Sequence, residues 1–288
     1  MDSNLARRLI VAAVAIPAAL LLAWYGGWPL VAVVAVVGVL GVRELFQFAE
    51  RQEIRASGPI GLVTAALFAP IAYAVTSAPA ARTAVERAWP YAAALWLVGV
   101  LTWALAARRP TDRPLTAVAV TLFAPLYAAA LLAFLVPIRH GTFGERSWPG
   151  AWLVFFPLVV TWVCDSAAMF GGRAMKGPKL APSVSPGKTR SGSLAGMAGG
   201  LLTAVIFHYA VFPRLGIQAG LGEMLVIAGV LSVVGQAGDL AESLFKREIG
   251  VKDSGTLIPG HGGILDRFDS LYFVVPVAAA LYRLFGLI

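Results

Sequence analysis

Long apolar runs, separated by shorter polar segments, extend along the whole chain. Nine runs can be distinguished, at about 9–25, 28–42, 59–78, 89–107, 115–137, 149–170, 193–213, 222–237 and 264–287. Most are close to the ~20 residues that a helix needs to cross the hydrocarbon core of a bilayer. The run at 28–42 is short, and the run at 222–237 is interrupted by Gly229 and Gly235. The pattern predicts an all-α, polytopic integral membrane bundle of about nine transmembrane helices.

The composition agrees with a membrane location. Hydrophobic residues make up 59% of the 288 positions and charged residues only 13%, whereas a soluble domain has about 25% charged residues. The single cysteine, Cys164, lies in an apolar run and excludes an intrachain disulfide. We predict one membrane domain over residues 1–288, with N-terminal spans at 1–148 and a half that carries the chemistry at 149–288.

The distribution of Lys and Arg gives the expected orientation. If the N-terminus is cytoplasmic, 17 of the 23 Lys and Arg residues fall on the cytoplasmic side and 6 on the other side. Because positive charges are enriched in cytoplasmic loops, this asymmetry predicts a cytoplasmic N-terminus. The net charge of +8 then reflects topology or an anionic ligand, and we expect no nucleic acid partner.

Two polar stretches, 171–192 and 238–263, are expected to be cytoplasmic loops. Seven of the 15 acidic residues are Asp165 or lie at 239–269. Asp165 lies near the end of an apolar run, and an ionisable residue at membrane depth is costly enough to indicate function. The alternative is a residue at a helix end that pairs with a nearby base such as Arg173.

The first polar stretch contains a Gly-Lys-Thr triplet at 187–189. It looks like the end of a P-loop, but Pro182 stands where that motif requires glycine, and no strand is expected before it. Lys188, the hydroxyls of Ser185 and Thr189, and the N–H groups of a following helix could nevertheless hold a phosphate. A cationic loop rich in turn residues explains the segment equally well.

The second stretch combines carboxylates with positive charges. Asp239, Glu242 and Lys246 are spaced i, i+3 and i+7, so on a helix they share one face. Asp266 and Asp269 follow near the start of the last apolar run. Carboxylates without cysteine, and with one histidine nearby, indicate a hard cation such as Mg²⁺ rather than zinc. A charged surface helix would show the same spacing.

Glycines surround the histidine of this stretch. His261 is preceded by Gly260 and followed by Gly262 and Gly263. Glycines at such positions allow the backbone to approach a ligand closely. We expect His261 to contact a ligand or to shape the loop rather than to act as an acid or base.

Several segments resemble the phosphatidate cytidylyltransferases, also called CDP-diacylglycerol synthases. They are SLFKREIGVKDSGTLIPGHGGILDRFD at 243–269, GDLAES at 238–243, LAPSVSPGKT at 180–189 and the Asp165-Ser166 pair. The first is similar to the long C-terminal signature of that family, and the resemblance covers about residues 160–288. Ser191 and the segment 171–177 depart from the family pattern, so we assign them no role.

The resemblance implies an enzyme that converts CTP and phosphatidic acid into CDP-diacylglycerol and pyrophosphate with one or two Mg²⁺ ions. It implies that Asp239 and Asp266 bind the metal and that Lys188 joins them in catalysis. It also implies that phosphatidic acid is taken from the cytoplasmic leaflet of a bacterial inner membrane, with the active site facing the cytoplasm. Whether the chain forms a homodimer stays open.

The chemistry of the residues agrees with that reaction. A phosphomonoester has its second pKa near ~6, so the attacking phosphate needs no strong base. The two substrates bring about five to six negative charges, which must be neutralised. The expected substrate contacts are Ser185, Lys188, Thr189, Lys246, Arg247, Lys252, His261, Gly262, Gly263 and Arg267. The carboxylates expected either to orient these groups or to form plain salt bridges are Asp165, Glu242, Asp253 and Asp269.

Two other functions stay open at this point. A related lipid cytidylyltransferase, or a lipid kinase with a different acceptor, would need a similar set of charges. An ion-coupled transporter would also use carboxylates inside the membrane. Transporter folds, however, usually show paired repeats in both halves, whereas the unusual polar positions here all lie in the second half.

Overall fold

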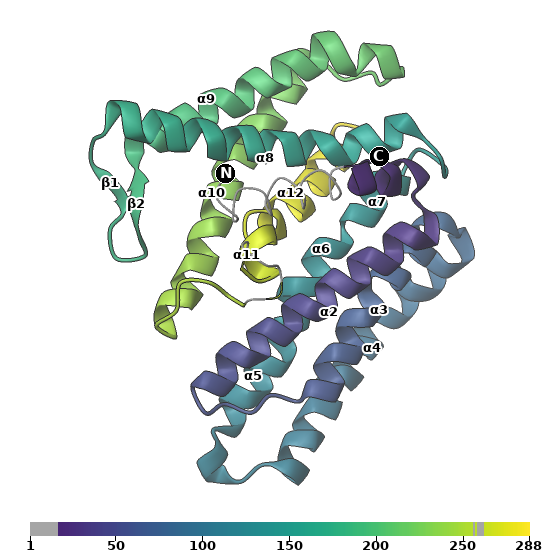
Figure 1. Ribbon diagram of the computed structural model, residues 1–288. Helices are drawn as coiled ribbons and strands as arrows, with labels where there is room; N and C mark the ends of the chain where they lie inside the picture. Colours follow the sequence, from purple (N-terminus) through teal and green to yellow (C-terminus); the bar gives the residue numbers. More distant parts are fainter. Residues whose placement is uncertain (1–16, 256, 258–261) are drawn as a thin grey trace.

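The computed structural model describes residues 17–255, 257 and 262–288, and these are mostly helical (Figure 1). The long helices are α2 (Gly27–Arg51), α3 (Gly58–Ser77), α4 (Pro79–Ala107), α5 (Pro114–Pro125), α8 (Trp148–Met175), α9 (Arg190–Ile206), α10 (Leu221–Glu248) and α12 (Leu271–Leu284). The short helices are η1 (Pro110–Asp112), η2 (Leu126–Ala130), α6 (Leu131–Ala133), α7 (Leu135–His140), η3 (Phe207–Val211), η4 (Pro213–Leu215) and α11 (Leu265–Phe268). Two strands, β1 (Lys179–Ala181) and β2 (Ser185–Thr189), complete the described elements.

Seven segments of the described chain are long and apolar enough to cross a membrane. They are Gly27–Arg51, Gly58–Ser77, Pro79–Ala107, Pro114–His140, Trp148–Met175, Arg190–Val211 and Leu221–Glu248. The two runs that looked least regular in the sequence, 28–42 and 222–237, lie inside the full-length helices α2 and α10. Helix α10 continues through Gly235, and this glycine lies against α12, where an added Cβ would be 3.2 Å from Val274. The structure thus confirms a mostly helical protein with seven segments that could span a membrane.

Two of the nine predicted spans are not among these seven. The first, at 9–25, is described only from residue 17 onward, where it is helical. The last, at 264–287, consists of α11 and the 14-residue α12, and this is shorter than the ~20 residues of a typical span. The number of nine therefore remains a prediction.

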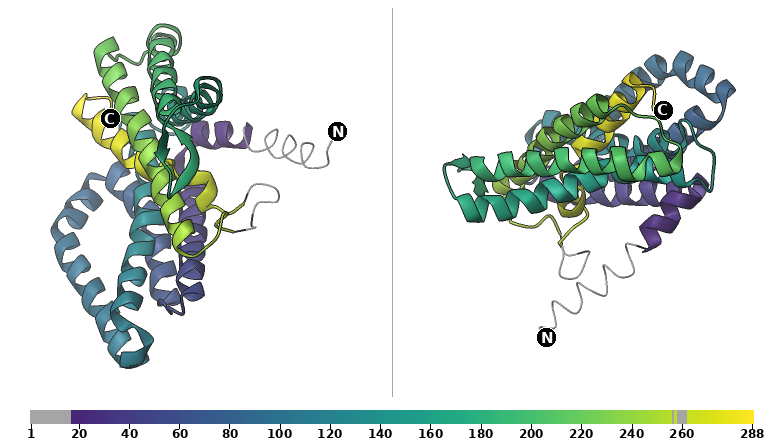
Figure 2. Two further views of the ribbon diagram at one scale, coloured as in Figure 1. Left: turned by 90° about the vertical axis from the view of Figure 1, so that its left-hand side faces the viewer. Right: turned by 90° about the horizontal axis from the view of Figure 1, so that it is seen from above.

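Helices α8 and α9 lie side by side along most of their length, and the β1–β2 hairpin joins them at one end (Figures 1 and 2). Gly192, Gly196 and Gly200 are spaced by four and bring α9 against its neighbours. A Cβ at Gly192 or Gly196 would clash with backbone oxygens of α8, and one at Gly200 would overlap Ser232 of α10. Small residues at this spacing allow membrane helices to approach closely.

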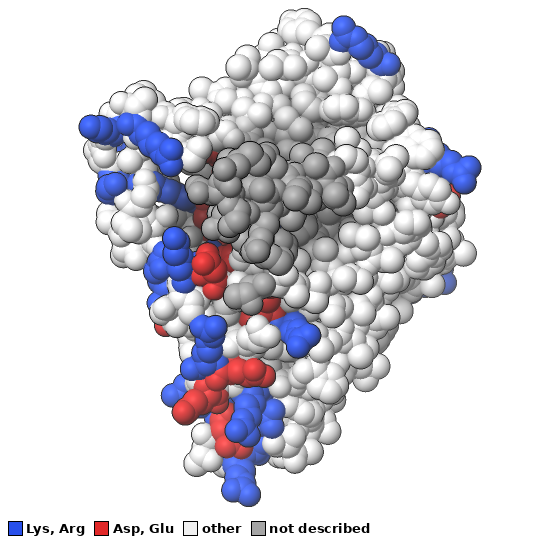
Figure 3. Space-filling model, in the orientation of Figure 1, with Lys and Arg blue, Asp and Glu red and all other residues white. Residues whose placement is uncertain are grey.

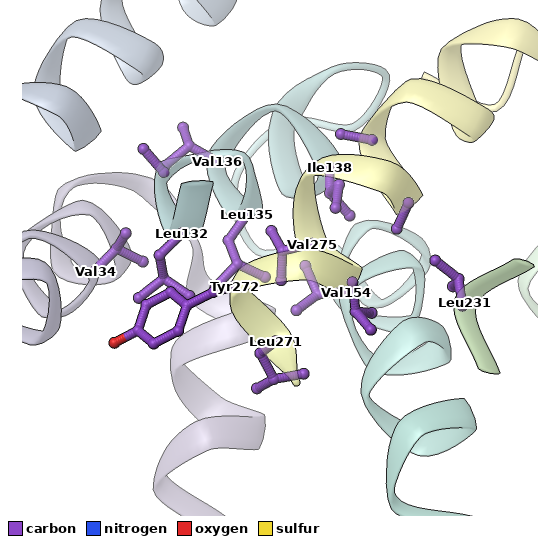
Figure 4. Packing of buried hydrophobic residues seen from close by; sticks show 14 of the residues in the cluster. Val34, Leu132, Leu135, Val136, Ile138, Val154, Leu231, Leu271, Tyr272 and Val275 are labelled. Carbon is purple, nitrogen blue, oxygen red and sulfur yellow. The ribbon is translucent and has the colours of Figure 1, made fainter. Parts of the chain in front are cut away.

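One hydrophobic cluster connects the two halves of the chain (Figure 4). Tyr272 of α12 is fully buried near its centre, and Val34 of α2, Leu132 of α6, Val154 of α8 and Leu231 of α10 belong to the same cluster. Helix α12 thus packs against elements from both halves. The first half is part of the scaffold that positions the polar residues of the second half.

The polar stretches 171–192 and 238–263 were expected to be loops, and the structure shows that they contain regular elements. Helix α8 continues to Met175 and α10 to Glu248, while β1 and β2 pair antiparallel. Thr189 then caps α9, because its Oγ1 accepts a hydrogen bond from the N–H of Gly192 at 3.1 Å. The expectation that no strand precedes the Gly-Lys-Thr triplet was wrong, because β1 lies before it. The triplet itself lies within β2 and not in a loop between a strand and a helix, so the geometry still differs from a P-loop.

Candidate functional site

Charged side chains gather on one side of the molecule. Figure 3 shows most of the Lys, Arg, Asp and Glu residues of the visible face along the side where the β1–β2 hairpin and the end of α10 lie, while the remainder is largely uncharged. On this face the charges are therefore concentrated along one side, and this side includes the segments that carry the predicted motifs.

A cavity of about 840 Å³ opens in this region between α8, the hairpin, α9 and α10. Its polar lining comes from Asp165, Arg173, Lys176, Lys179, Lys188, Thr189, Ser193, Gln236 and Asp239. Four of these residues, namely Asp165, Lys188, Thr189 and Asp239, were predicted from the sequence. The basic residues of the end of α8 and of β1, and Gln236 of α10, were not, because nothing in their spacing sets them apart from ordinary residues near a membrane surface.

An ion pair joins the hairpin to α10 at this cavity. The Nζ atom of Lys188 lies 2.5 Å from Oδ2 of Asp239, and each side chain is about a quarter exposed (26% and 28%). The other carboxylate oxygen of Asp239 accepts a hydrogen bond from Ser243 at 3.3 Å. The hairpin carries Lys188 to this position from a segment 51 residues away in the chain. Two of the predicted site residues are thereby brought together by the fold.

Asp239 is part of a group of three carboxylates. Asp165 of α8 and Asp269, between α11 and α12, both experience the charge of Asp239, and Lys188 partly offsets it at both. Of the three, Asp165 and Asp239 line the cavity while Asp269 does not, and Lys188 pairs with Asp239. The predicted role of Asp165 as more than a helix-end residue is consistent with this position.

The donor set of this wall fits a hard cation. All three side chains offer carboxylate oxygens, which are the ligands that Mg²⁺ prefers. Within the described part of the chain, no three Asp, Glu, His or Cys side chains form a complete metal site by themselves. Mg²⁺ is usually bound by one or two carboxylates together with substrate phosphates, so an incomplete protein site of this kind is suitable for it.

A second ionic cluster lies further along α10. Lys246 is buried, and its Nζ atom lies 3.1 Å from Glu242 and 2.8 Å from Asp266. Glu242 is completely buried. The predicted helix face is therefore divided, since Asp239 borders the cavity while Glu242 and Lys246 point into the protein. Lys246 is not among the residues that line the cavity, and its observed contacts are with the two carboxylates.

Asp266 is held by a dense set of donors. Its Oδ1 accepts from Lys246 at 2.8 Å, and its Oδ2 accepts from the N–H of Ser254 at 2.7 Å and the N–H of Gly263 at 2.9 Å. A lysine ammonium and two backbone N–H groups thus occupy both oxygens of the Asp266 carboxylate.

The remaining predicted residues that the structure describes are not among those that line the cavity. Arg247 is exposed and donates to the backbone oxygens of Val184, in the hairpin, and Val251, so it ties the hairpin to the end of α10. Lys252, Asp253 and Arg267 are exposed. Ser185 is half-buried in β2, and Gly262 adopts a positive φ of 81° beside Asp266. His261 lies outside the described residues.

Ser191, to which the sequence assigned no role, closes the connection between α8 and α9. Its Oγ donates to the backbone oxygen of Lys176 and lies 3.2 Å from Oγ1 of Thr189. The hydroxyl of Thr189 is thus already engaged by Gly192 and Ser191. These contacts hold the base of the hairpin and, with it, the position of Lys188.

One polar residue next to the site was missed altogether. Glu44 of α2 is 5% exposed and contacts the segment that carries Asp266. The available signal was the charged pair Arg43-Glu44 directly before the apolar residues Leu45 and Phe46. In the sequence, such a residue looks the same as an ordinary charge at the end of a span.

Comparison with known proteins covers almost the whole chain. The model of the cytidylyltransferase family matches residues 6–285. A phosphatidate cytidylyltransferase of Brucella suis biovar 1 (strain 1330) is 50% identical over 139 residues, which are 47% of each chain. One from Rickettsia felis is 38% identical over 157 residues, covering 53% of this chain and 68% of the relative. One from Haemophilus influenzae is 38% identical over 162 residues, or 56% of each chain.

The pairwise matches span about half the length of the Brucella relatives, whereas the family match extends from the N-terminal region to the last helix. A match of this extent agrees with the helical architecture and with the signature at 243–269. The chain belongs to the cytidylyltransferase family.

Proposed function

We propose that the chain is a phosphatidate cytidylyltransferase, which forms CDP-diacylglycerol and pyrophosphate from CTP and phosphatidic acid. In this reaction a phosphate oxygen of the lipid attacks the α-phosphorus of CTP, and the bond to the β-phosphate breaks as pyrophosphate leaves. The observation that carries the proposal is the Lys188–Asp239 pair at the wall of a large cavity lined by further bases. The names of the curated relatives support the same reaction.

The main task of such a site is to neutralise and align two anions. The attacking phosphate is largely ionised at neutral pH, because its second pKa is near ~6, so no strong base is required. Lys188, Arg173, Lys176 and Lys179 all line the cavity and would contact the phosphates. Their charges would hold the lipid phosphate and the triphosphate close together, in the alignment that phosphoryl transfer requires.

We assign Asp239 and Asp266 as the carboxylates that would hold one or two Mg²⁺ ions. Asp239 lines the cavity, whereas Asp266 does not line it and would have to exchange one of its present donors for the metal. A lysine neutralises each of them, Lys188 for Asp239 and Lys246 for Asp266. When bound, Mg²⁺ would supply positive charge to the triphosphate. Of the two lysines, Lys188 is the more exposed and is placed to turn from Asp239 to a substrate phosphate. Asp165 and Asp269 would then add to the negative field that attracts the cation.

The membrane arrangement completes the proposal. We infer about nine spans with a cytoplasmic N-terminus, because 17 of the 23 Lys and Arg residues then lie on the cytoplasmic side. The cavity would open to the cytoplasm, which supplies CTP, and to the leaflet that contains phosphatidic acid. The bacterial sources of the relatives suggest the inner membrane of a bacterium as the location.

Turnover by the purified protein tests the function directly. Protein in detergent, supplied with labelled CTP, phosphatidic acid and Mg²⁺, should release CDP-diacylglycerol and pyrophosphate in equal amounts. A lipid kinase would instead transfer the terminal phosphate to the lipid, and a related transferase would prefer another lipid acceptor in competition. A transporter would give no product at all without a gradient. Absence of CDP-diacylglycerol under these conditions would contradict the proposal.

Replacement of Lys188 tests the contact with the triphosphate. A hydrogen bond to a charged group contributes about 1.5–3 kcal/mol, and each 1.36 kcal/mol is a factor of ten. Lys188→Ala should therefore reduce kcat/KM for CTP by about 10- to 100-fold. Arg190→Ala is the matched control, because Arg190 is exposed and lies two residues away without lining the cavity. Equal kinetics for the two variants would show that Lys188 has only a structural role.

A further inference from the structure

Glu44 is a buried acid in the half of the chain that has no other part in the proposed site. It lies on α2, is 5% exposed, and is surrounded on its helix by the buried residues Val42, Leu45 and Phe46. A carboxylate in such surroundings is costly unless hydrogen-bond donors surround it. The hydrogen-bond donors to Glu44 identify the segment that it holds in place.

Among the described residues, the donors to Glu44 come from the segment around Asp266. Oε1 accepts from the N–H of Ile264 at 2.8 Å, and Oε2 accepts from the N–H of Leu265 at 2.9 Å and from Oγ of Ser254 at 2.8 Å. These partners lie 210 to 221 residues from Glu44 in the chain. One carboxylate of α2 thus fixes the two amides that directly precede Asp266.

Ser254 connects Glu44 to Asp266 itself. Its Oγ lies 2.8 Å from Oε2 of Glu44 and 2.9 Å from Oδ2 of Asp266, and its N–H donates to the same oxygen of Asp266 at 2.7 Å. Because a hydroxyl has a single proton, it can donate to only one of the two carboxylates at a time. The position of Asp266 therefore depends on Ser254, and the position of Ser254 depends on Glu44.

Two glycines of the C-terminal signature leave room for Glu44. A Cβ at Gly263 would overlap Oγ of Ser254 and lie 2.5 Å from both oxygens of Glu44, and one at Gly255 would lie 3.0 Å from Oε1. The sequence predicted that the glycines around His261, Gly263 among them, allow the backbone to approach a ligand. At Gly263, and also at Gly255, the group that the backbone approaches is the carboxylate of Glu44.

We propose that Glu44 is a positioning residue for the reaction, which acts through Ser254 and the amides of Ile264 and Leu265 to hold Asp266 in place. This inference rests on the proposed function, because it gives Asp266 a part in turnover. Glu44 does not line the cavity, so its effect on the reaction is indirect. It makes α2, in the first half of the chain, a necessary part of the site.

A double-mutant cycle measures the connection. In Glu44→Gln the side chain keeps its size, but one oxygen becomes an NH₂ group, so at least one of the amides of Ile264 and Leu265 loses its acceptor. Partners that orient metal-binding groups typically contribute 10- to 100-fold to activity, so kcat per folded enzyme should fall by about that factor. The KM for phosphatidic acid should be unchanged. Ser254→Ala should also lower kcat, and the double variant should be no slower than Glu44→Gln alone.

Glu50→Gln is the matched control, since Glu50 is exposed on the same helix, and its kcat should equal that of the wild type. If Glu44 only braced the fold, Glu44→Gln would lower the thermal midpoint while kcat per folded enzyme stayed the same. Fully independent effects in the double variant would also overturn the inference, because they would mean that Glu44 does not act through Ser254.

A spin label separates this inference from the proposed function. Leu257 is 54% exposed, so Leu257→Cys in a Cys164→Ser background gives a single labelling position in the segment between Ser254 and Gly263. Glu44→Gln should add a more mobile component to the spectrum, and Glu50→Gln should not. An unchanged spectrum in Glu44→Gln would overturn the inference whether or not the protein turns over CTP. Failure of the wild type to form CDP-diacylglycerol would contradict the function alone.

Discussion

Asp239→Asn is expected to lower the turnover of CTP and phosphatidic acid by about two to three orders of magnitude without reducing the amount of folded protein. A bound metal contributes several kcal/mol of charge stabilisation, and each 1.36 kcal/mol is a factor of ten in rate. The substitution removes the carboxylate charge at the cavity wall and leaves Lys188 without its 2.5 Å partner. Both side chains are partly exposed, so water can replace the lost contact and the fold should survive. The measurement is kcat in detergent, normalised to folded protein.

Glu248→Gln is the control for this variant, because Glu248 is an exposed acid on the same helix. Its turnover should match that of the wild type. If Asp239→Asn retained more than a modest fraction of wild-type turnover, Asp239 would not be a metal ligand. The same change at Asp266 is less informative, since Asp266 also anchors Ser254, Gly263 and Lys246 and its loss would disturb the segment as well.

Lys246→Met should destabilise the protein by about 3–5 kcal/mol, which is the usual effect of removing one partner of a buried ion pair. Glu242 is completely buried, and among the described residues no hydrogen bond of good geometry reaches its two oxygens. The charge of Lys246, 3.1 Å away, is what compensates it. Without that charge, the carboxylate would be buried alone. The expected readout is a large fall in the thermal midpoint in detergent.

Two further variants make this prediction specific. Lys252→Met removes an exposed lysine six residues further along the chain, and its midpoint should stay close to that of the wild type. Glu242→Leu combined with Lys246→Met removes the pair with Glu242, and apolar replacement of a buried pair is often neutral. Asp266 still loses its contact with Lys246 but keeps its hydrogen bonds from Ser254 and Gly263, so the double variant should recover part of the stability. A Lys246→Met midpoint as high as that of Lys252→Met would show that the ion pair contributes little.

The sequence was most informative about helices and about which residues carry chemistry. Apolar runs of about 20 residues specify membrane helices through composition alone, and this is why α2, α3 and α10 appear where runs were predicted. Lys188 and Asp239 were singled out by motif and are in contact in the structure. The predicted face of Asp239, Glu242 and Lys246 is helical, although its members belong to two clusters.

The sequence did not predict which parts of the polar stretches form regular secondary structure. The hairpin of β1 and β2 forms in a segment that reads as a turn-rich loop, because two strands of three and five residues carry too few positions to show an alternating pattern. The burial of Lys246 could likewise not be predicted from the sequence, since a lysine on a helix is exposed in most proteins. Its burial depends on Asp266, 20 residues further along.

The sequence alone determined that this is a helical membrane protein whose second half carries the signature at 243–269. It also determined that the charged residues are concentrated in a few segments. Hydropathy and motif spacing are local properties, so they can be read from the chain. Only the tertiary structure decided that Glu44 belongs to the same network as Asp266, because its hydrogen bonds span more than 200 residues. An acid in an apolar run is stable only where donors reach it, and folding alone determines which distant amides become those donors.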